Sequence, residues 1–290
     1  MKKIIILIPV FNDWESLIKL ISEINENVKD YKNISFDLMI VNDASTIKQP
    51  KLIKPSNINS IQIFNMKENR GHARCNAFGI RYVEKNKEFN NLILMDGDGE
   101  DRPVEIKNLI NESINKSNIS IVAKRIKRSE GPIFQLLYQI HKIITYVFTG
   151  KYINFGNYSC LTKKDVEKLN SEASLWSSYS GTLKKIIPEF GEIDSIRGKR
   201  YFGPSKMSLL KLLMHSFAII AVFKYQVFLR STFLIIILSF INMFLGNISI
   251  FFQILIVIFN LVIFIISLRE KKDELKESHN NLSRIEEITH

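Results

Sequence analysis

The chain has 290 residues, of which 46% are hydrophobic, and this length suits one sizeable α/β domain with accessory segments. The formal net charge of +11 falls on residues 1–225, since residues 226–268 carry only Arg230 and the rest has a net charge of −1. Such a basic domain suits an anionic lipid surface. No Lys/Arg-rich stripe with interleaved aromatic residues occurs, which argues against a nucleic-acid partner. Two cysteines without a CxxC motif or a Cys/His cluster argue against a zinc site and a disulfide framework, and they fit a reducing compartment.

Strand-like and helix-like segments alternate over the first 125 residues. A signal peptide is the alternative for the N-terminus, but Pro9 interrupts the apolar run and no cleavage site follows it, so we expect a buried strand there. Strand–helix alternation predicts a mainly parallel sheet covered on both faces, with ligands at the carboxyl ends of its strands. The strands are expected at residues 3–10, 36–41, 61–64, 92–95 and 119–123, and helices after Asn12 and Asp13, at 71–84 and at 103–114.

Two apolar segments near the C-terminus predict a transmembrane hairpin. Residues 248–268 carry no charge and form a helix of about 32 Å, which matches the hydrocarbon thickness of a bilayer. Residues 231–245 span it only if 227–229 join them and Arg230 reaches the surface. Gly246 and Asn247 form the turn between the two spans. Lysine and arginine flank the pair on its outer sides, which predicts that both termini lie in the cytoplasm.

Four segments follow from this division of the chain. We expect a catalytic domain at 1–205, an amphipathic helix in the membrane interface at 206–225, two transmembrane helices at 226–268 and a solvated cytoplasmic tail helix at 269–290. Residues 126–200 are less regular, apart from an amphipathic helix at 132–148. The chain is therefore predicted to be a multi-pass protein of the cytoplasmic membrane.

An acidic motif follows the expected strand at 92–95. Asp96, Asp98, Glu100 and Asp101 lie within six residues, and such crowded carboxylates repel one another unless a cation is present. Carboxylates spaced in this way suit Mg²⁺ or Mn²⁺, which would also bind a diphosphate. A solvated acidic turn is the alternative. An EF-hand is excluded because Pro103 follows too soon.

Two polar motifs end other strands. Asp43 lies in Val41-Asn42-Asp43-Ala44-Ser45, where a carboxylate can accept hydrogen bonds from a base or ribose and where a simple Asx turn is the alternative. Asn69-Arg70-Gly71-His72-Ala73-Arg74 opens a helix, and its small residues permit close backbone approach to an anion. The motif is not GxGxxG, which argues against a nicotinamide-dinucleotide fold.

Five motifs in order resemble family 2 glycosyltransferases with a GT-A fold, most closely the dolichol-phosphate mannose synthase-like branch. This branch includes bacterial polyprenyl-phosphate glycosyltransferases with a C-terminal pair of membrane spans. The resemblance covers residues 1 to about 270, and the fold it implies is an α/β GT-A domain followed by a two-helix transmembrane hairpin. The motifs are Pro9-Val10-Phe11-Asn12, Val41-Asn42-Asp43-Ala44-Ser45, Asn69-Arg70-Gly71, Asp96-Gly97-Asp98 and Arg200-Tyr201-Phe202-Gly203-Pro204-Ser205-Lys206.

The resemblance implies roles for matching residues. Asp43 is expected to contact the base or ribose of the nucleotide, Asp96 to hold the nucleotide, and Asp98 to bind the metal, with Asp96 as a second metal ligand. Asp101 matches an acidic position beside the reaction centre. Arg125 matches an arginine near the acceptor phosphate. Independently of the resemblance, Lys124, Lys127 and Arg128 follow the fifth strand together with Arg125 and are expected to supply further positive charge for that phosphate. The remaining nucleotide-binding positions are Pro9, Phe11, Asn69, Gly71 and Ser205, and Arg200 closes over the phosphates.

The implied activity is that of an inverting, metal-dependent hexosyltransferase using Mg²⁺ or Mn²⁺. It would move a sugar from a nucleotide-sugar to a polyprenyl phosphate or related lipid-linked acceptor, with a homo-oligomer left open. The chain departs from the family pattern at Asn42, Ala44 and Glu100, where the family usually has an acidic residue, Gly and Gln, and at Asn157-Tyr158-Ser159. These departures affect the expected identity of the nucleotide and the sugar rather than the reaction class. The alternatives are transfer to a sugar hydroxyl of a surface polysaccharide intermediate, a nucleotidyltransferase and a non-catalytic nucleotide-binding scaffold. A processive synthase is disfavoured because the Gln-x-x-Arg-Trp string is absent.

Overall fold

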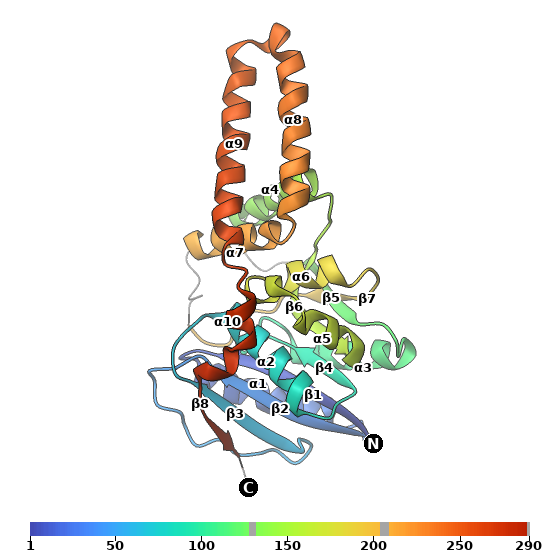
Figure 1. The fold of residues 1–290 in the computed structure, drawn as a ribbon. Coiled ribbons are helices and arrows are strands. Elements are labelled where there is room, and N and C mark those ends of the chain that lie inside the picture. The colour runs from blue at the N-terminus through green and yellow to red at the C-terminus, as the bar shows by residue number, and fades with distance from the viewer. Residues whose placement is uncertain (128–131, 204–208, 289–290) are drawn as a thin grey trace.

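The computed structural model describes residues 1–127, 132–203 and 209–288. One eight-stranded sheet, in the order β7-β5-β6-β4-β1-β2-β3-β8, forms the centre of a domain from which a two-helix hairpin projects (Figure 1). The strands are β1 (Lys2–Val10), β2 (Ile34–Asn42), β3 (Ser60–Met66), β4 (Asn91–Leu94), β5 (Ile121–Lys127), β6 (Phe155–Thr162), β7 (Gly191–Ile196) and β8 (Leu282–Glu287).

The sheet is mainly parallel, as the strand–helix alternation predicts. β1 pairs in parallel with β2 and β4, β2 with β3, and β5 with β7. β6 runs antiparallel between β4 and β5, and β8 runs antiparallel along β3. The five expected strands are confirmed as β1 to β5, although β5 continues to Lys127. β6 and β7 were not expected, because Gly, Asn, Ser and charged residues interrupt their apolar pattern.

Helices cover both faces of the sheet, because side chains along β1 alternate between two cores. Ile4, Ile6 and Ile8 pack with α1 (Trp14–Val28) and α3 (Ile106–Asn115). Ile5 and Leu7 pack on the other face. That face is covered by α2 (His72–Asn86), α5 (Lys163–Asn170) and α6 (Tyr179–Ile186). Each of these fully buried aliphatic side chains stabilises the fold by roughly 1.5–3 kcal/mol.

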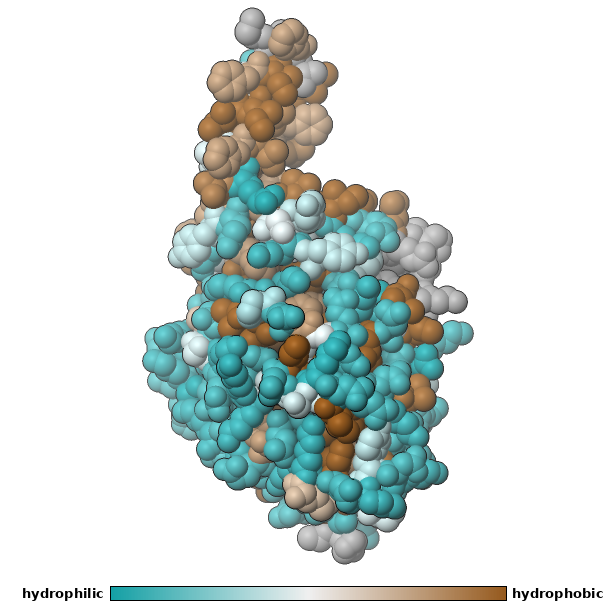
Figure 2. All heavy atoms as spheres, turned by 90° about the vertical axis from the view of Figure 1, so that its right-hand side faces the viewer, coloured by the Kyte–Doolittle hydropathy of each residue, from teal (hydrophilic) through white to brown (hydrophobic). Residues whose placement is uncertain are grey.

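The hairpin consists of α8 (Lys224–Leu245) and α9 (Asn247–Ser267), joined at Gly246, whose φ of 51° favours glycine. By length and composition both helices can cross a membrane, since their apolar windows have mean hydropathies of 1.5 and 2.8 and are each only 11% buried. Figure 2 shows the hydrophobic surface of the hairpin projecting from a largely hydrophilic domain. The side chain of Arg230 is held at the base of the hairpin, because its Nη1 donates to the backbone carbonyl of Val147 in α4 (Pro132–Thr149) at 3.1 Å.

Two further helices lie at the base of the hairpin (Figure 1). α4 (Pro132–Thr149) confirms the expected helix at 132–148. α7 (Leu209–Ala221) occupies the described part of the helix expected at 206–225, and α8 begins at Lys224, slightly before the expected start of the spans. Exposed apolar residues lie on both, including Leu136, Ile140 and Ile143 of α4 and Leu210 of α7.

The expectation of a solvated tail helix after residue 269 is wrong. Within the described residues 269–288, α10 (Lys272–Lys276) is the only α-helix, and a 3₁₀ turn then leads into β8, which pairs with β3. The physical reason is that β3 is otherwise an edge strand with unpaired backbone groups. Hydrogen bonding to that edge determines β8, whose side chains are mostly exposed and therefore carry little hydrophobic pattern.

Candidate functional site

The carboxyl ends of β1, β2 and β4 lie together at one edge of the sheet. Their register places Val10 beside Asn42 and Leu7 beside Leu94. Three of the predicted motifs therefore lie together at this edge: the one that begins at Pro9, the one that contains Asp43 and the acidic motif. This is the position at which ligands bind in open α/β sheets.

Asn12 joins the loops after β1 and β2. Its φ is 52°, and its side-chain Oδ1 accepts hydrogen bonds from the backbone amides of Thr46 and Ile47 at 2.8 and 2.9 Å. Pro9 is buried under this junction, whereas the ring of Phe11 is 39% exposed. Of these two predicted nucleotide-binding residues, Phe11 is therefore partly accessible to solvent, whereas Pro9 is buried.

Both carboxylate oxygens of Asp43 bind the loop before α2. Oδ1 accepts from the amide of Arg70 and Oδ2 from the amide of Gly71, each at 2.9 Å. Asp43 is only 4% exposed, while Asn69 in the same loop is exposed. The carboxylate thus fixes the loop that leads to the N-terminus of α2, and it also lies within hydrogen-bond reach of the Cys75 thiol.

His72 connects the Asp43 loop to the acidic motif. It follows Gly71 directly, and its Nε2 lies 2.8 Å from Oδ1 of Asp96. Asn157 on β6 donates to the same oxygen at 3.2 Å. No role could be predicted for the His72 side chain, because a single histidine at the start of a helix carries no signal without its partner.

Three carboxylates gather in the loop after β4. Oδ2 of Asp101 accepts from the backbone amide of Asp96 at 2.9 Å, and Oδ1 of Asp98 accepts from the amide of Glu100 at 3.1 Å. Asp101 is 4% exposed, so its charge is removed from water. The structure therefore brings Asp96, Asp98 and Asp101 together, as the spacing of the motif predicts.

Burial and mutual repulsion change the ionisation of these groups. Burial, together with the carboxylates of Asp96 and Glu100, raises the pKa of Asp98 to about 6. Burial and the carboxylate of Asp96 raise the pKa of Asp101 to about 7. Burial also opposes ionisation of Asp96, but the adjacent imidazole of His72 holds its pKa below the usual range. Positive charge brought to this loop would be stabilised.

The segment 197–203 lies against the acidic loop. The amide of Tyr201 donates to the carbonyl of Asp98 at 2.9 Å, and the amide of Gly198 donates to the carbonyl of Glu100 at 2.8 Å. Gly99 has a φ of 87°, and a Cβ there would lie 2.5 Å from the ring of Tyr201. Glycine is therefore required at the contact between the two segments.

This segment also delivers two arginines. Arg200 donates from Nη1 to Oδ2 of Asp98 at 2.8 Å and contacts Asp13, while Arg197 contacts Glu100. Arg200 thus reaches the acidic loop as predicted, whereas Arg197 was not singled out in the sequence. Ser205, in the same predicted motif, lies outside the described residues.

Arg125 lies within β5 rather than after it. Its Nη2 is 3.9 Å from Oδ1 of Asp101, and its side chain is 15% exposed. The guanidinium lies against Gly156 of β6, where a Cβ would clash with it. Lys124 does not share this position, because successive strand residues face opposite ways and its Nζ pairs with Glu192 at 3.6 Å. The expectation that Lys124 is a second cation beside Arg125 is therefore wrong.

α7 contributes His215 to the same region. Burial and the positive charges of His72 and Arg125 lower the pKa of His215 to about 4, so its imidazole is neutral at pH 7. The helix at the base of the hairpin therefore lies close to the acidic site. Sequence reasoning missed His215, which lies in a mostly apolar segment that also carries Lys211 and Ser216.

The predicted metal ligands fit a cation that is held only partly by protein. Within the parts of the chain that the structure describes, no three His, Cys, Asp or Glu side chains converge as a metal site. Mg²⁺ in phosphate sites is commonly held by one or two carboxylates together with substrate phosphates. Asp96 and Asp98 offer oxygen ligands of this kind. Burial and the carboxylates of Asp96 and Glu100 raise the pKa of Asp98, and a cation would offset both effects. The residues therefore fit a divalent cation that binds together with a diphosphate.

Comparison with known proteins identifies the chain's relatives. The model of the family "Glycosyl transferase family 2" matches residues 5–187. The undecaprenyl-phosphate 4-deoxy-4-formamido-L-arabinose transferase of Photorhabdus laumondii is 26% identical over 220 residues, 73% of this chain and 65% of that protein. The enzyme of the same name from Proteus mirabilis is 24% identical over 219 residues, 73% of this chain and 64% of that protein. The chain thus spans just under two thirds of the length of these relatives.

Solved structures share the GT-A fold. Glucosyl-3-phosphoglycerate synthase from Mycobacterium tuberculosis, in complex with Mn²⁺, uridine diphosphate and glucosyl-3-phosphoglycerate, gives a TM-score of 0.51 at 9% identity, covering 78% of this chain and 80% of that chain. Its complex with Mn²⁺, uridine diphosphate and phosphoglyceric acid gives a TM-score of 0.53 at 9% identity, covering 78% of each chain. The sheet and the helices on its two faces are thus those of a known enzyme fold.

Proposed function

Because the chain belongs to glycosyl transferase family 2, we propose that it moves a sugar from a nucleotide-sugar to a polyprenyl phosphate at the cytoplasmic face of a membrane. One observation carries the proposal. The carboxylates of Asp96, Asp98 and Asp101 lie in a single loop, in which Arg200 binds Asp98 and Arg125 lies near Asp101. An acidic centre for a metal-bound diphosphate thus adjoins a separate cation for a second phosphate.

The donor would bind along the edge formed by β1, β2 and β4. In this proposal Asp43 and the ring of Phe11 contact the nucleoside, and the loop at Asn69 and Gly71 approaches the ribose or diphosphate. A divalent cation held by Asp98 and Asp96 would neutralise charge on the departing diphosphate. The solved relatives contain Mn²⁺ and uridine diphosphate, and this supports a divalent cation without identifying which one.

The acceptor needs little deprotonation if it is a phosphate. A phosphate monoester has a second pKa near 6 and is largely anionic at pH 7. Its oxygen would attack the anomeric carbon while the bond to the diphosphate breaks on the opposite side, so the configuration inverts. Arg125 would orient the attacking phosphate, and Arg200 would stabilise the charge of the leaving nucleoside diphosphate.

The pairing of β8 with β3 supports the membrane placement. The N-terminal domain and the segment after the hairpin are in one sheet, so the chain between them crosses the bilayer an even number of times. Exposed apolar residues of α4 and α7 at the base of the hairpin would enter the membrane interface. The acidic site, close to His215 of α7, would then lie near the lipid headgroups, and the prenyl chain need not leave the bilayer.

One observation favours a second acceptor class. A carboxylate with a pKa near 7 is suited to general-base catalysis, and Asp101 has such a pKa. A sugar hydroxyl would need such a base, whereas a phosphate would not. Asp101→Asn should therefore nearly abolish transfer to a hydroxyl but reduce transfer to a phosphate only moderately.

The test is to incubate membranes containing the full chain with a panel of labelled nucleotide-sugars and Mg²⁺. We expect label in a lipid that releases its sugar on mild acid, as a polyprenyl-phosphate sugar does. The Asp98→Asn variant should give no labelled lipid. Label in an acid-stable glycolipid would support the hydroxyl acceptor instead. If the protein binds nucleoside diphosphates but transfers sugar from no nucleotide-sugar in the panel, the result would support a non-catalytic scaffold.

A further inference from the structure

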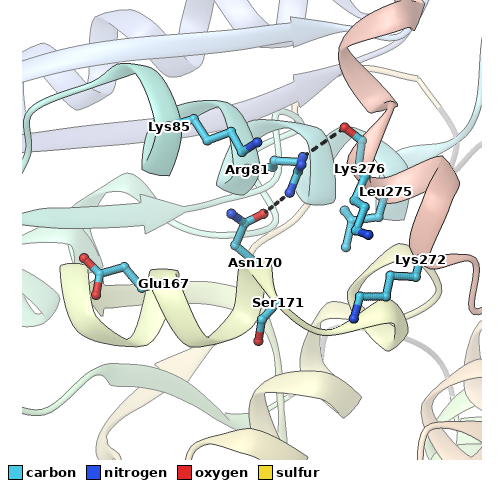
Figure 3. A pocket seen from close by; sticks show the side chains of 8 residues that line it. All are labelled: Arg81, Lys85, Glu167, Asn170, Ser171, Lys272, Leu275 and Lys276. Atoms are coloured by element: carbon cyan, nitrogen blue, oxygen red, sulfur yellow. Dashed lines mark hydrogen bonds between the residues drawn. The ribbon is translucent and has the colours of Figure 1, made fainter.

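A basic pocket lies between α2, α5 and α10, away from the acidic loop (Figure 3). Its volume is about 510 Å³. Four cationic side chains line it, Arg81 and Lys85 from α2 and Lys272 and Lys276 from α10, and Glu167 is the one acidic residue of the lining. The side chains lining this hollow therefore carry a net positive charge.

Arg81 is held in position without being neutralised. Its Nη1 donates to Oδ1 of Asn170 at 3.0 Å, and its Nε donates to the backbone carbonyl of Lys276 at 3.2 Å. Both acceptors are uncharged. The carboxylate in this network, Glu84, accepts at 2.6 Å from Asn170 rather than from Arg81. Figure 3 shows both hydrogen bonds of Arg81, and it shows the carboxylate of Glu167 directed away from this group.

The three lysines of the pocket are also without acidic partners. Among the described residues, no carboxylate forms an ion pair with Lys85, Lys272 or Lys276, and all three are exposed. The neighbouring Lys271, by contrast, pairs with Glu274 at 2.5 Å. Like charges facing one concave surface repel one another and raise the local concentration of anions. An anion with several oxygens would accept hydrogen bonds from more than one of them.

We propose that this pocket binds a phosphate-bearing anion, either a soluble phosphate or a lipid headgroup. Arg81 would provide the fixed, planar donor, and the lysines would close around the ligand from both helices. Arg81 is nine residues along α2 from His72, roughly 14 Å at 1.5 Å per residue, so this site is distinct from the acidic one. A bound anion would join α10, which follows the hairpin, to α2 of the catalytic domain. The proposal does not depend on the transferase activity.

The experiment measures how readily each lysine is acetylated, by mass spectrometry of the full chain in lipid nanodiscs without divalent cations. One arm adds pyrophosphate to nanodiscs of phosphatidylcholine. The other arm adds no pyrophosphate and includes phosphatidylglycerol in the nanodiscs. Lys48 and Lys51 are exposed lysines elsewhere on the domain and serve as internal controls. We expect acetylation of Lys85, Lys272 and Lys276 to fall at least fivefold in one arm, with the controls unchanged.

A double variant then tests the site itself. Lys85→Gln with Lys276→Gln should weaken the anion's protection of Lys272 at least tenfold in apparent affinity, about 1.4 kcal/mol. Lys48→Gln with Lys51→Gln changes net charge equally and should have no effect. Protection by pyrophosphate identifies a soluble ligand, and protection only with phosphatidylglycerol identifies a headgroup. No protection in either arm, equal protection of the control lysines, or unaltered affinity in the double variant would overturn the proposal.

Discussion

Arg200 donates a hydrogen bond from Nη1 to Oδ2 of Asp98 at 2.8 Å, so the guanidinium is bound to the carboxylate proposed to hold the metal. The same side chain contacts Asp13 at the end of the loop after β1. When no nucleotide-sugar is bound, Arg200 therefore neutralises part of the negative charge of the acidic loop. A cation at Asp98 would have to share or replace this contact.

Asp98→Asn should lower kcat at least a hundredfold while leaving the fold intact. The amide keeps an oxygen for the backbone hydrogen bond from Glu100 but loses the charge that binds a cation. The measurement is sugar transfer at saturating Mg²⁺, beside circular dichroism of the same preparation. Asp30→Asn, which removes an exposed carboxylate elsewhere, is the matched control. Near wild-type turnover of Asp98→Asn would rule out the metal assignment.

Arg200→Ala should have two opposite effects. Mn²⁺ should bind the donor-free protein more tightly, because the competing guanidinium at Asp98 is gone. Turnover should nevertheless fall by about a hundredfold, since a charged donor to the leaving diphosphate is lost. Mn²⁺ titration followed by electron paramagnetic resonance and steady-state kinetics give the two values. Weaker Mn²⁺ binding in the variant would mean that Arg200 supports the metal site rather than competing with it.

Arg125→Ala should raise the KM for the acceptor or lower kcat by about ten- to a hundredfold, since a charge-assisted hydrogen bond is worth about 1.5–3 kcal/mol. Affinity for the nucleotide should change little. Lys124→Ala is the control, because this neighbour faces the opposite way and pairs with Glu192 at the surface. Arg125 is not the acceptor-phosphate ligand if its variant loses only nucleotide affinity.

Asp101→Asn should change the pH dependence of stability. Burial and Asp96 raise the pKa of Asp101 to about 7 in the folded protein, above the ordinary value of 3.8. Between these pH values the folded state holds a proton that the unfolded state has released, so this group lowers stability as pH rises through the window. Asparagine cannot ionise. Relative to wild type, the variant should therefore gain about 2 kcal/mol between pH 5 and pH 7.5.

The measurement for Asp101→Asn is thermal unfolding in detergent without divalent cations, followed by tryptophan fluorescence at both pH values. Comparison with wild type at each pH removes the contributions of titrating groups that do not interact with Asp101. Parallel Tm curves for the two proteins would contradict the raised pKa. Added Mg²⁺ should stabilise wild type more than the variant at pH 7.5.

The hairpin should place its turn and the following segment on opposite sides of the membrane. Asn247→Cys should react with a membrane-impermeant maleimide in intact cells, and Lys272→Cys should react only after lysis. The natural cysteines, Cys75 and Cys160, are both buried and give a low background. Reaction of both introduced cysteines from the same side would exclude a two-span hairpin.

Local sequence was sufficient for β1 to β5 because these strands are short apolar runs whose burial produces the pattern. The same reasoning failed at β6, where Gly156, Asn157 and Ser159 occupy a sheet position between two other strands. Gly156 is needed there to accommodate the guanidinium of Arg125, and Asn157 donates to Asp96. Residues that contact the site thus interrupt the apolar pattern by which β6 could have been predicted.

The acidic loop could be predicted because its carboxylates are neighbours in sequence. The contacts of His72, Arg197 and His215 could not, since each depends on a distant segment. His72 meets Asp96 across 24 positions, and Arg197 meets Glu100 across 97. Arg200 was found only through its motif, and Lys124 was misplaced because side-chain direction depends on where β5 ends. Spacing along the chain identifies candidate residues, but the sheet determines which of them meet.

The pairing of β8 with β3 sets an order of events during biosynthesis. β3 (Ser60–Met66) is made before the hairpin, whereas its partner β8 (Leu282–Glu287) is made only after it. The hairpin lies between them, so it is synthesised and available to the membrane before the sheet can close. Until then the outer edge of β3 has free backbone groups that could pair with another nascent chain. Membrane insertion that separates neighbouring nascent chains would therefore protect this edge until β8 covers it.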